Sequence, residues 1–262
     1  MTGALGKRSN GYARRMLHRG VAERIHMIED AYVNWFLVEE AGKLTVVDSG
    51  HPSSWKSLQS ALSELGHSSG DIEALVLTHA HFDHMGFARR AHQELDVPVW
   101  AHELETPVVR HPWRYEHERS RWPYFVRHPG FVKIFTAMGV AGALWVKGLE
   151  DVRTYEAGER LEVPGRPQVV FTPGHTHGHS SLAFPDRGTV IAGDAIVTLN
   201  PYTARTGPQI VAGAATADSA RALASLDALA ATRADTVLCG HGAVWKQGTE
   251  LAVERARAAG PS

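Results

Sequence analysis

The sequence predicts an α/β protein in which two sheets pack face to face and helices cover their outer sides. Two observations carry this prediction: strand-like runs first follow one another and then alternate with helical patterns, and the same order recurs in the second half. A chain of 262 residues is long enough to bury the core of one large domain or two small ones.

The first half should begin with three strands, because short runs of β-branched and aromatic residues are separated by turn or polar residues. They are expected near residues 23–28, 31–39 and 43–48. A helix follows, with Trp55, Leu58 and Leu62 on one face and Gly66 at its end. Next come a buried strand in IEALVLTH, which leads into LTHAHFDHMG, then a helix in FARRAHQEL and a strand in VPVWAH.

The second half repeats this style of organisation. Strands are expected in QVVFTPGH, SSLAFPD and GTVIAGD, a helix over 215–232, a last strand in ADTVLCGHG and a C-terminal helix at about 246–259. The predicted domain therefore spans residues 22–262, preceded by a flexible basic tail over residues 1–21.

Residues 103–150 interrupt this pattern with an aromatic insertion that lacks clear strands. Between residues 110 and 133 it carries six Arg or Lys against two Glu. We expect helices here, either as a surface hairpin packed on the core or as a lid over a substrate site.

The overall composition is that of a soluble globular protein with a net charge of −1. This balance argues against nucleic acid or an anionic membrane as a partner. The single cysteine, Cys239, excludes an intramolecular disulfide, and neither a signal peptide nor an apolar run of membrane-spanning length is evident. We therefore expect a cytoplasmic protein.

Candidate metal ligands follow the predicted strands at the points where the strands end: His79, His81, Asp83, His84, His175, Asp194 and His241. In an extended segment, His79 and His81 project to the same side and can share one ion. Asp83 and His84 lie where the chain turns into a helix, so they can hold a second ion. Imidazole and carboxylate ligands suit Zn²⁺ best, with Fe or Mn as alternatives.

The motifs THAHFDHMG, TPGHTHGHS, AGDAI and CGHG, with LTVVDSG upstream, resemble those of the metallo-β-lactamase superfamily. The resemblance implies a four-layer αβ/βα sandwich with a helical insertion and two zinc ions. It implies that His79, His81 and His175 bind the first ion, that Asp83, His84 and His241 bind the second, that Asp194 bridges them, and that Asp48 supports the ligands.

The remaining histidines have other expected roles. His179 alternates with His175 and is expected to form a hydrogen bond near the site. We expect His51, His67, His92, His111, His117 and His128 at the surface.

These assignments predict a hydrolase in which a metal-bridging hydroxide cleaves an ester, lactone or thioester. The substrate is expected to be small, and it could carry a negative charge. Asp83 and Asp194 would be its catalytic carboxylates. Candidate substrate contacts are Tyr202, Arg205, Trp113 and Arg114. A β-lactam hydrolase, a non-haem iron oxidoreductase and a nucleic-acid phosphodiesterase remain open as alternatives, and the insertion could also form a homodimer.

Overall fold

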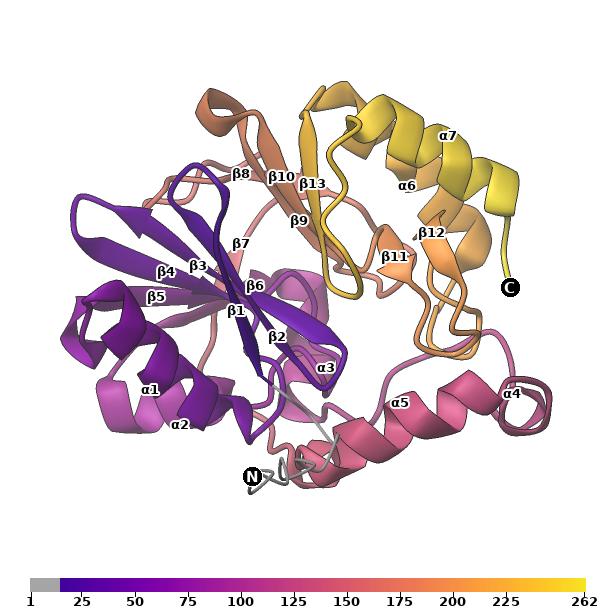
Figure 1. Ribbon diagram of the computed structural model, residues 1–262, viewed down its shortest axis with the longest axis horizontal. Helices are drawn as coiled ribbons and strands as arrows, with labels where there is room; N and C mark the ends of the chain where they lie inside the picture. The colour runs from indigo at the N-terminus through magenta and orange to yellow at the C-terminus, as the bar shows by residue number, and fades with distance from the viewer. Residues whose placement is uncertain (1–14) are drawn as a thin grey trace, which may run out of the picture.

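The computed structural model describes residues 15–262 and consists of two sheets packed against each other, with helices on both outer sides (Figure 1). The seven-stranded sheet has the order β1-β2-β3-β4-β5-β6-β7, and the four-stranded sheet has the order β13-β10-β9-β8. This layering confirms the predicted αβ/βα sandwich.

The seven-stranded sheet changes character halfway across. Strands β1 to β4 pair antiparallel, whereas β4 to β7 pair parallel and need helices as connections. The strands are β1 (Met16–Ala22), β2 (Ile25–Asp30), β3 (Val33–Glu40), β4 (Lys43–Val47), β5 (Ile72–Val76), β6 (Val99–His102) and β7 (Arg153–Tyr155).

The four-stranded sheet holds the C-terminal strands. It contains β8 (Gln168–Phe171), β9 (Ser180–Phe184), β10 (Thr189–Gly193) and β13 (Thr236–Cys239). A separate antiparallel hairpin is formed by β11 (Val197–Leu199) and β12 (Thr206–Gln209).

Four helices belong to the outer layers: α1 (Ser54–Leu65), α2 (Ala88–Leu95), α6 (Ser219–Ala231) and α7 (Thr249–Ala259). Gly66 ends α1 in the left-handed conformation, with a φ of 82°. Short 3₁₀ turns are η1 (Ser69–Asp71), η2 (Glu103–Glu105), η3 (Ala143–Trp145) and η4 (Pro185–Arg187). Among the described residues, no helix combines the length and apolar character needed to cross a bilayer.

Strand periodicity divides the interior into separate layers. On β3, Trp35 and Leu37 belong to the core that includes α1 and α2, whereas Phe36 and Val38 belong to the core between the sheets. A third core joins the four-stranded sheet to α6 and α7 through residues such as Leu226. Each sheet therefore packs against apolar side chains on both of its faces.

The insertion is helical, as predicted, and contains α3 (Thr106–Arg110), α4 (Trp122–Arg127) and α5 (Pro129–Val140). Phe131, Ile134 and Met138 of α5 are buried in the core that includes α1 and α2. Helix α5 lies below the β11–β12 hairpin in Figure 1, with α4 at its right-hand end.

The prediction that the basic tail extends to residue 21 is wrong, because Met16–Ala22 pairs with β2 as the edge strand of the larger sheet. Arg15, just before this strand, donates a hydrogen bond to the carboxylate of Glu64, and Arg19, within the strand, donates one to the backbone carbonyl of Glu64. Residues 1–14 of the predicted tail lie outside the described residues. Strands β7, β11 and β12 were also not predicted. Strands β7 and β11 have only three residues each, and β12 contains Gly207 and Pro208, which disfavour a strand.

Candidate metal centre

All the predicted ligands lie on loops that follow strands, at one edge of the sandwich. Asp48 follows β4, the THAHFDH segment follows β5, His175 follows β8, Asp194 follows β10 and His241 follows β13. The larger sheet supplies the first two of these groups and the smaller sheet the other three. The site therefore exists only when the two sheets are packed together.

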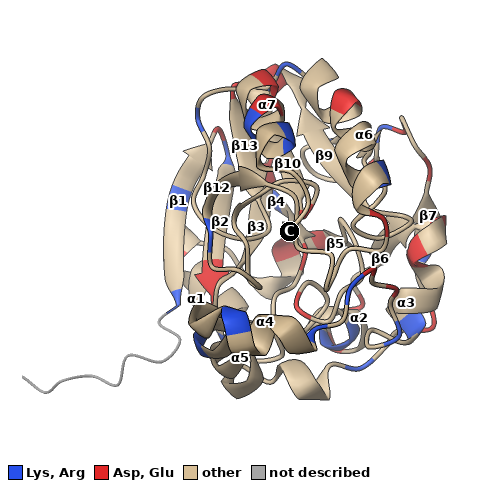
Figure 2. Ribbon diagram, turned by 90° about the vertical axis from the view of Figure 1, so that its right-hand side faces the viewer, with Lys and Arg blue, Asp and Glu red and all other residues tan. Residues whose placement is uncertain are grey.

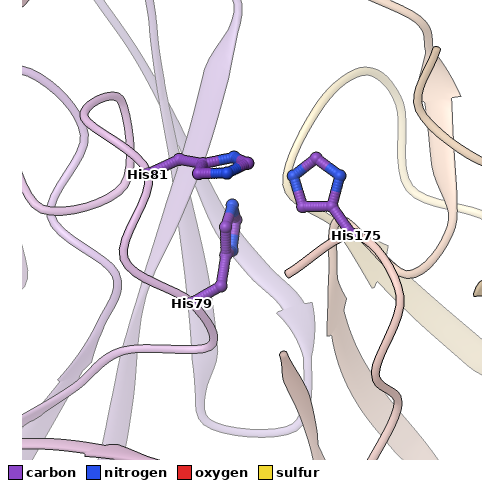
Figure 3. Close-up of side chains that lie close together, drawn as sticks. All are labelled: His79, His81 and His175. Atoms are coloured by element: carbon purple, nitrogen blue, oxygen red, sulfur yellow. The ribbon is translucent and has the colours of Figure 1, made fainter. Parts of the chain in front are cut away.

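The first cluster joins His79 and His81 from one sheet to His175 from the other (Figure 3). One ring nitrogen from each lies within 4.8 Å of the others. In all three residues the Nε2 atom is buried and lacks a hydrogen-bond partner within the described chain. Buried polar atoms are normally hydrogen-bonded, so three converging free imidazole nitrogens fit a cation such as Zn²⁺.

The second cluster joins Asp83, His84 and His241 within the same 4.8 Å limit. The Oδ2 atom of Asp83 lies 3.5 Å from Nε2 of His241 and 4.0 Å from Nε2 of His84. One carboxylate and two imidazoles again form a donor set that suits zinc or iron.

Asp194 lies between the two clusters. Its Oδ2 atom is 3.5 Å from Nε2 of His175 in the first cluster and 3.3 Å from Nε2 of His241 in the second. Its Oδ1 atom is 3.7 Å from Nε2 of His84 and has no hydrogen-bond partner among residues 15–262. This carboxylate can therefore contact ions in both clusters.

Asp48 lies close enough to His79 and His84 to form a third potential cluster, but its oxygens are already engaged. Oδ1 accepts a hydrogen bond from the amide of Thr78 (2.8 Å), and Oδ2 accepts one from the hydroxyl of Thr78 (2.9 Å). Nδ1 of His84 lies 3.0 Å from Oδ2. Asp48 therefore orients His84, with its Nε2 free for a metal.

Three of the four other predicted histidine ligands are oriented in the same way through Nδ1. His241 donates to the carbonyl oxygen of Tyr32 (2.7 Å), and the Nδ1 atoms of His79 and His175 lie beside the hydroxyls of Thr78 (3.1 Å) and Thr216 (3.3 Å). In each case Nε2 is left for the ion.

His179 is placed as a support and not as a ligand. Its Nε2 atom accepts a hydrogen bond from the backbone amide of Asp194 (3.0 Å), and its Nδ1 atom lies 2.9 Å from the hydroxyl of Thr172. Both ring nitrogens are thus used within the protein, and this histidine fixes the position of the carboxylate between the clusters.

The electrostatics favour the protonation states that metal ligands need. Burial, together with neighbouring imidazoles, holds the pKa of His79 and of His81 well below the usual value, so both rings are neutral. Burial alone would raise the pKa of Asp194, but the adjacent His241 and His84 lower it, so the carboxylate is ionised. Neutral imidazoles and an ionised carboxylate are ready to bind a cation.

His241 differs because, although burial opposes its charge, Asp194 and Asp83 raise its pKa well above the usual value. In the metal-free protein both ring nitrogens of His241 therefore carry a proton: Nδ1 donates to Tyr32, and Nε2 is protonated as well. A metal ion at the second cluster must displace the Nε2 proton, so binding there should release it to solvent.

The expectation that His51 lies at the surface is wrong. Its side chain is fully buried, and neither ring nitrogen has a hydrogen-bond partner in the described structure. Burial lowers the pKa of His51 to about 4; the charge of Asp83 opposes this shift, and that of His84 adds to it. The start of α1 and the loop after His84 contact the segment that carries His51: the amide of Ser54 donates to the carbonyl oxygen of His51 (2.9 Å), and the amide of Gly86 donates to that of Gly50 (2.8 Å).

Glu105, at the start of the insertion, is a fully buried carboxylate that was not predicted. Its Oε2 atom accepts a hydrogen bond from the amide of Ala80 (2.8 Å), and Oε1 accepts one from the amide of Gly178 (2.9 Å). Glu105 thus connects the loop that carries His79 and His81 to the loop that carries His175. No motif marks it, because only the tertiary structure brings these two amides together.

Above the ligands, the insertion closes a cavity of about 20 Å³, room for roughly one water molecule. Tyr115, Phe135 and Met138 of the insertion line this cavity together with His81, Asp83, His175, Asp194 and His241. The insertion therefore covers the metal site, as a lid would.

Two of the four predicted substrate residues lie beside this site. Tyr202 lines the cavity, and Trp113 stacks on the cavity residue Phe82 with ring centroids 4.3 Å apart. Arg114 is exposed and does not line the cavity, and Arg205 lines a different pocket.

Tyr115 is a further residue that the sequence did not single out. Its ring centroid lies 4.0 Å from that of His81, and the guanidinium of Arg121 lies over the ring, 4.9 Å from its centre. Burial raises the pKa of Tyr115 to about 12, so the phenol stays neutral and can donate a hydrogen bond.

Two ligand clusters joined by a carboxylate, at one edge of an αβ/βα sandwich, define the class of metal-dependent hydrolases with this fold. The family model described as "Metallo-beta-lactamase superfamily" matches residues 28–241. The chain belongs to the metallo-beta-lactamase superfamily.

Relatives and solved structures agree with this assignment. The chain is 24% identical over 233 residues to the probable metallo-hydrolase YflN of Bacillus subtilis (strain 168), covering 84% of each protein. It superposes on the metallo-beta-lactamase family protein TTHA1429 of Thermus thermophilus with a TM-score of 0.64 and 23% identity, over 94% of this chain and 78% of that one. It superposes on TTHA1623, solved in a di-iron-bound form, with a TM-score of 0.58 and 26% identity, over 84% of this chain and 92% of that one.

Proposed function

We propose that the protein is a dinuclear metal hydrolase that cleaves an ester, lactone or thioester. The observation that carries this proposal is the pair of clusters with Asp194 between them. The first cluster offers three Nε2 atoms without hydrogen-bond partners among residues 15–262, and the second offers that of His84. The relation to YflN, described as a probable metallo-hydrolase, supports hydrolysis as the reaction type.

His79, His81 and His175 would hold one ion, Asp83, His84 and His241 the other, and Asp194 would contact both. Zinc is the proposed metal, and the di-iron form of TTHA1623 makes iron the alternative to test. When bound, the ions supply Lewis acidity and lower the pKa of water so that it can add to a carbonyl group.

The residues around the cavity would orient the substrate and exclude water. The neutral phenols of Tyr115 and Tyr202 can donate hydrogen bonds to a substrate oxygen, while Phe135 and Met138 cover its apolar part. The Asp83 carboxylate, held ionised by His84 and His241, can accept a proton and return it to the leaving group.

The test is an activity screen with zinc-loaded and iron-loaded protein on esters, lactones and thioesters, with β-lactams and phosphodiesters alongside. We expect turnover of esters, lactones or thioesters. In His84→Ala we expect the loss of one metal ion, measured by elemental analysis, and the loss of this activity. Turnover of only β-lactams or phosphodiesters, or full activity with a single ion, would overturn the proposal.

A further inference from the structure

A second hollow lies outside the metal site, between α4 and the loop that follows β11. We call it the arginine pocket, because it is lined by Arg119, Arg127 and Arg205 beside the aromatic rings of Tyr124 and His128. Its volume of about 330 Å³ is at the lower end of the range for pockets that hold organic ligands. Figure 2 views the molecule from the side on which α4 and the C-terminus lie, with Lys and Arg in blue.

The pocket is also lined by Ser262, and a C-terminal oxygen of Ser262 accepts a hydrogen bond from the phenol of Tyr124 (2.8 Å). No ion pair joins any of the three guanidinium groups to a carboxylate within residues 15–262, and residues 1–14 contain neither Asp nor Glu. Elsewhere on the surface, Arg90 pairs with Glu94 and Arg110 with Glu150. Three exposed cations against one carboxylate leave the pocket with an excess of positive charge, which favours an anionic ligand.

The arginine pocket and the metal cavity share a wall. The ring of Tyr124, in the pocket, contacts the ring of Tyr202, with centroids 5.6 Å apart and planes at 76°. Tyr202 lines the cavity on the other side, and Arg205 is three residues further along the same loop. A single aromatic layer therefore separates the cationic pocket from the metal ligands.

We propose that the arginine pocket binds the phosphate or pyrophosphate end of the substrate, while its ester, lactone or thioester group reaches the metal ligands on the other side of the Tyr124–Tyr202 layer. The cavity over these ligands holds only about one water molecule, so the insertion must move for this group to enter. This inference rests on the proposed function. Guanidinium groups bind phosphate oxygens through paired hydrogen bonds, and Tyr124 and His128 offer a surface on which an attached organic group can pack. The pocket would thus select phosphorylated substrates.

Binding can be measured without any turnover, by calorimetric titration of the metal-loaded protein with inorganic pyrophosphate. We expect binding that is about tenfold weaker in Arg127→Ala and in Arg205→Ala, because each removes a charged hydrogen bond. Lys133→Ala, which removes an exposed cation from the same insertion outside the pocket, should bind as the parent does. Because pyrophosphate also coordinates metals, binding that is lost in His84→Ala but kept in the arginine variants would overturn the proposal.

Kinetics provide the second test, with a phosphorylated and an uncharged ester of the same acyl group. The ratio of kcat/KM for the phosphorylated over the uncharged ester should fall about tenfold in each arginine variant and stay constant in Lys133→Ala. If neither ester is hydrolysed, the proposed function is contradicted, whereas the titration still tests whether the arginine pocket binds pyrophosphate. An unchanged ratio in the arginine variants would overturn the assignment of this pocket to substrate.

Discussion

At the scale of single residues, Asp48 is the group that fixes His84. It adopts a positive φ of 57°, which Asn tolerates better than most residues, so Asp48→Asn changes the charge with little strain. The variant leaves one oxygen to accept from Thr78 and His84 where the parent has two. We expect metal affinity to fall about 10–100-fold.

Competition with a zinc chelator would measure this loss. Asp227→Asn, on the exposed face of α6, is the matched control and should bind zinc as the parent does. If Asp48→Asn binds zinc with the same affinity as the parent, then the carboxylate of Asp48 is not needed to orient His84.

His51 predicts the acid sensitivity of the metal-free protein. The unfolded chain protonates this ring near pH 6.5, whereas burial lowers the pKa in the folded protein to about 4. The stability that depends on neutral His51 is therefore complete above pH 6.5 and is lost as the pH falls towards 4. Between pH 7 and pH 5 the residue should lower the free energy of unfolding by about 2 kcal/mol.

Urea denaturation at the two pH values, on the parent and on His51→Leu, would measure this contribution. Leu has a similar size and does not titrate, so the loss between pH 7 and pH 5 should be smaller in the variant by that amount. Equal losses in both proteins would assign the acid sensitivity to other groups.

At the scale of structural elements, Glu105 holds together two loops that belong to different sheets. Glu105→Gln places an amide NH₂ against one of two backbone donors, from Ala80 or Gly178, and leaves that donor unpaired in the interior. We expect a loss of about 1–3 kcal/mol in stability, with weaker metal binding at His79, His81 and His175.

Denaturation and metal titration of the same samples would show both effects. Glu103→Gln, an exposed neighbour in the same turn, should change neither. A stable Glu105→Gln protein with unchanged metal binding would contradict the connecting role.

At the scale of the whole molecule, the insertion limits access to the metal site. Phe135 of α5 lines the closed cavity, so Phe135→Ala should enlarge it and favour substrates with bulkier acyl groups. We expect kcat/KM for a bulky ester to rise roughly tenfold relative to a small one. Val132→Ala, on the exposed side of the same helix, is the control.

A series of esters of increasing acyl size would provide the measurement. The ratio of kcat/KM between Phe135→Ala and Val132→Ala should increase as the acyl group becomes larger. If the two variants respond alike along the series, then α5 does not restrict the substrate.

The strand ends explain why the ligands could be predicted. Each candidate follows a strand with a strong apolar pattern, and the strand end itself presents the polar group to the edge of the sheet. His79, His81 and His84 are close in sequence, so local geometry already brings them together. His175, Asp194 and His241 needed the pairing of β10 with β9 and β13 and the packing of the two sheets.

The sequence by itself determined the αβ/βα order of elements and the set of candidate metal ligands, because strand periodicity and side-chain chemistry are local properties. Only the tertiary structure decided that His51 and Glu105 are buried beside the site, that Tyr115 and Phe135 close it, and that Arg205 faces a separate pocket with Arg127. These placements depend on contacts between segments far apart in the chain, and such contacts leave no local pattern.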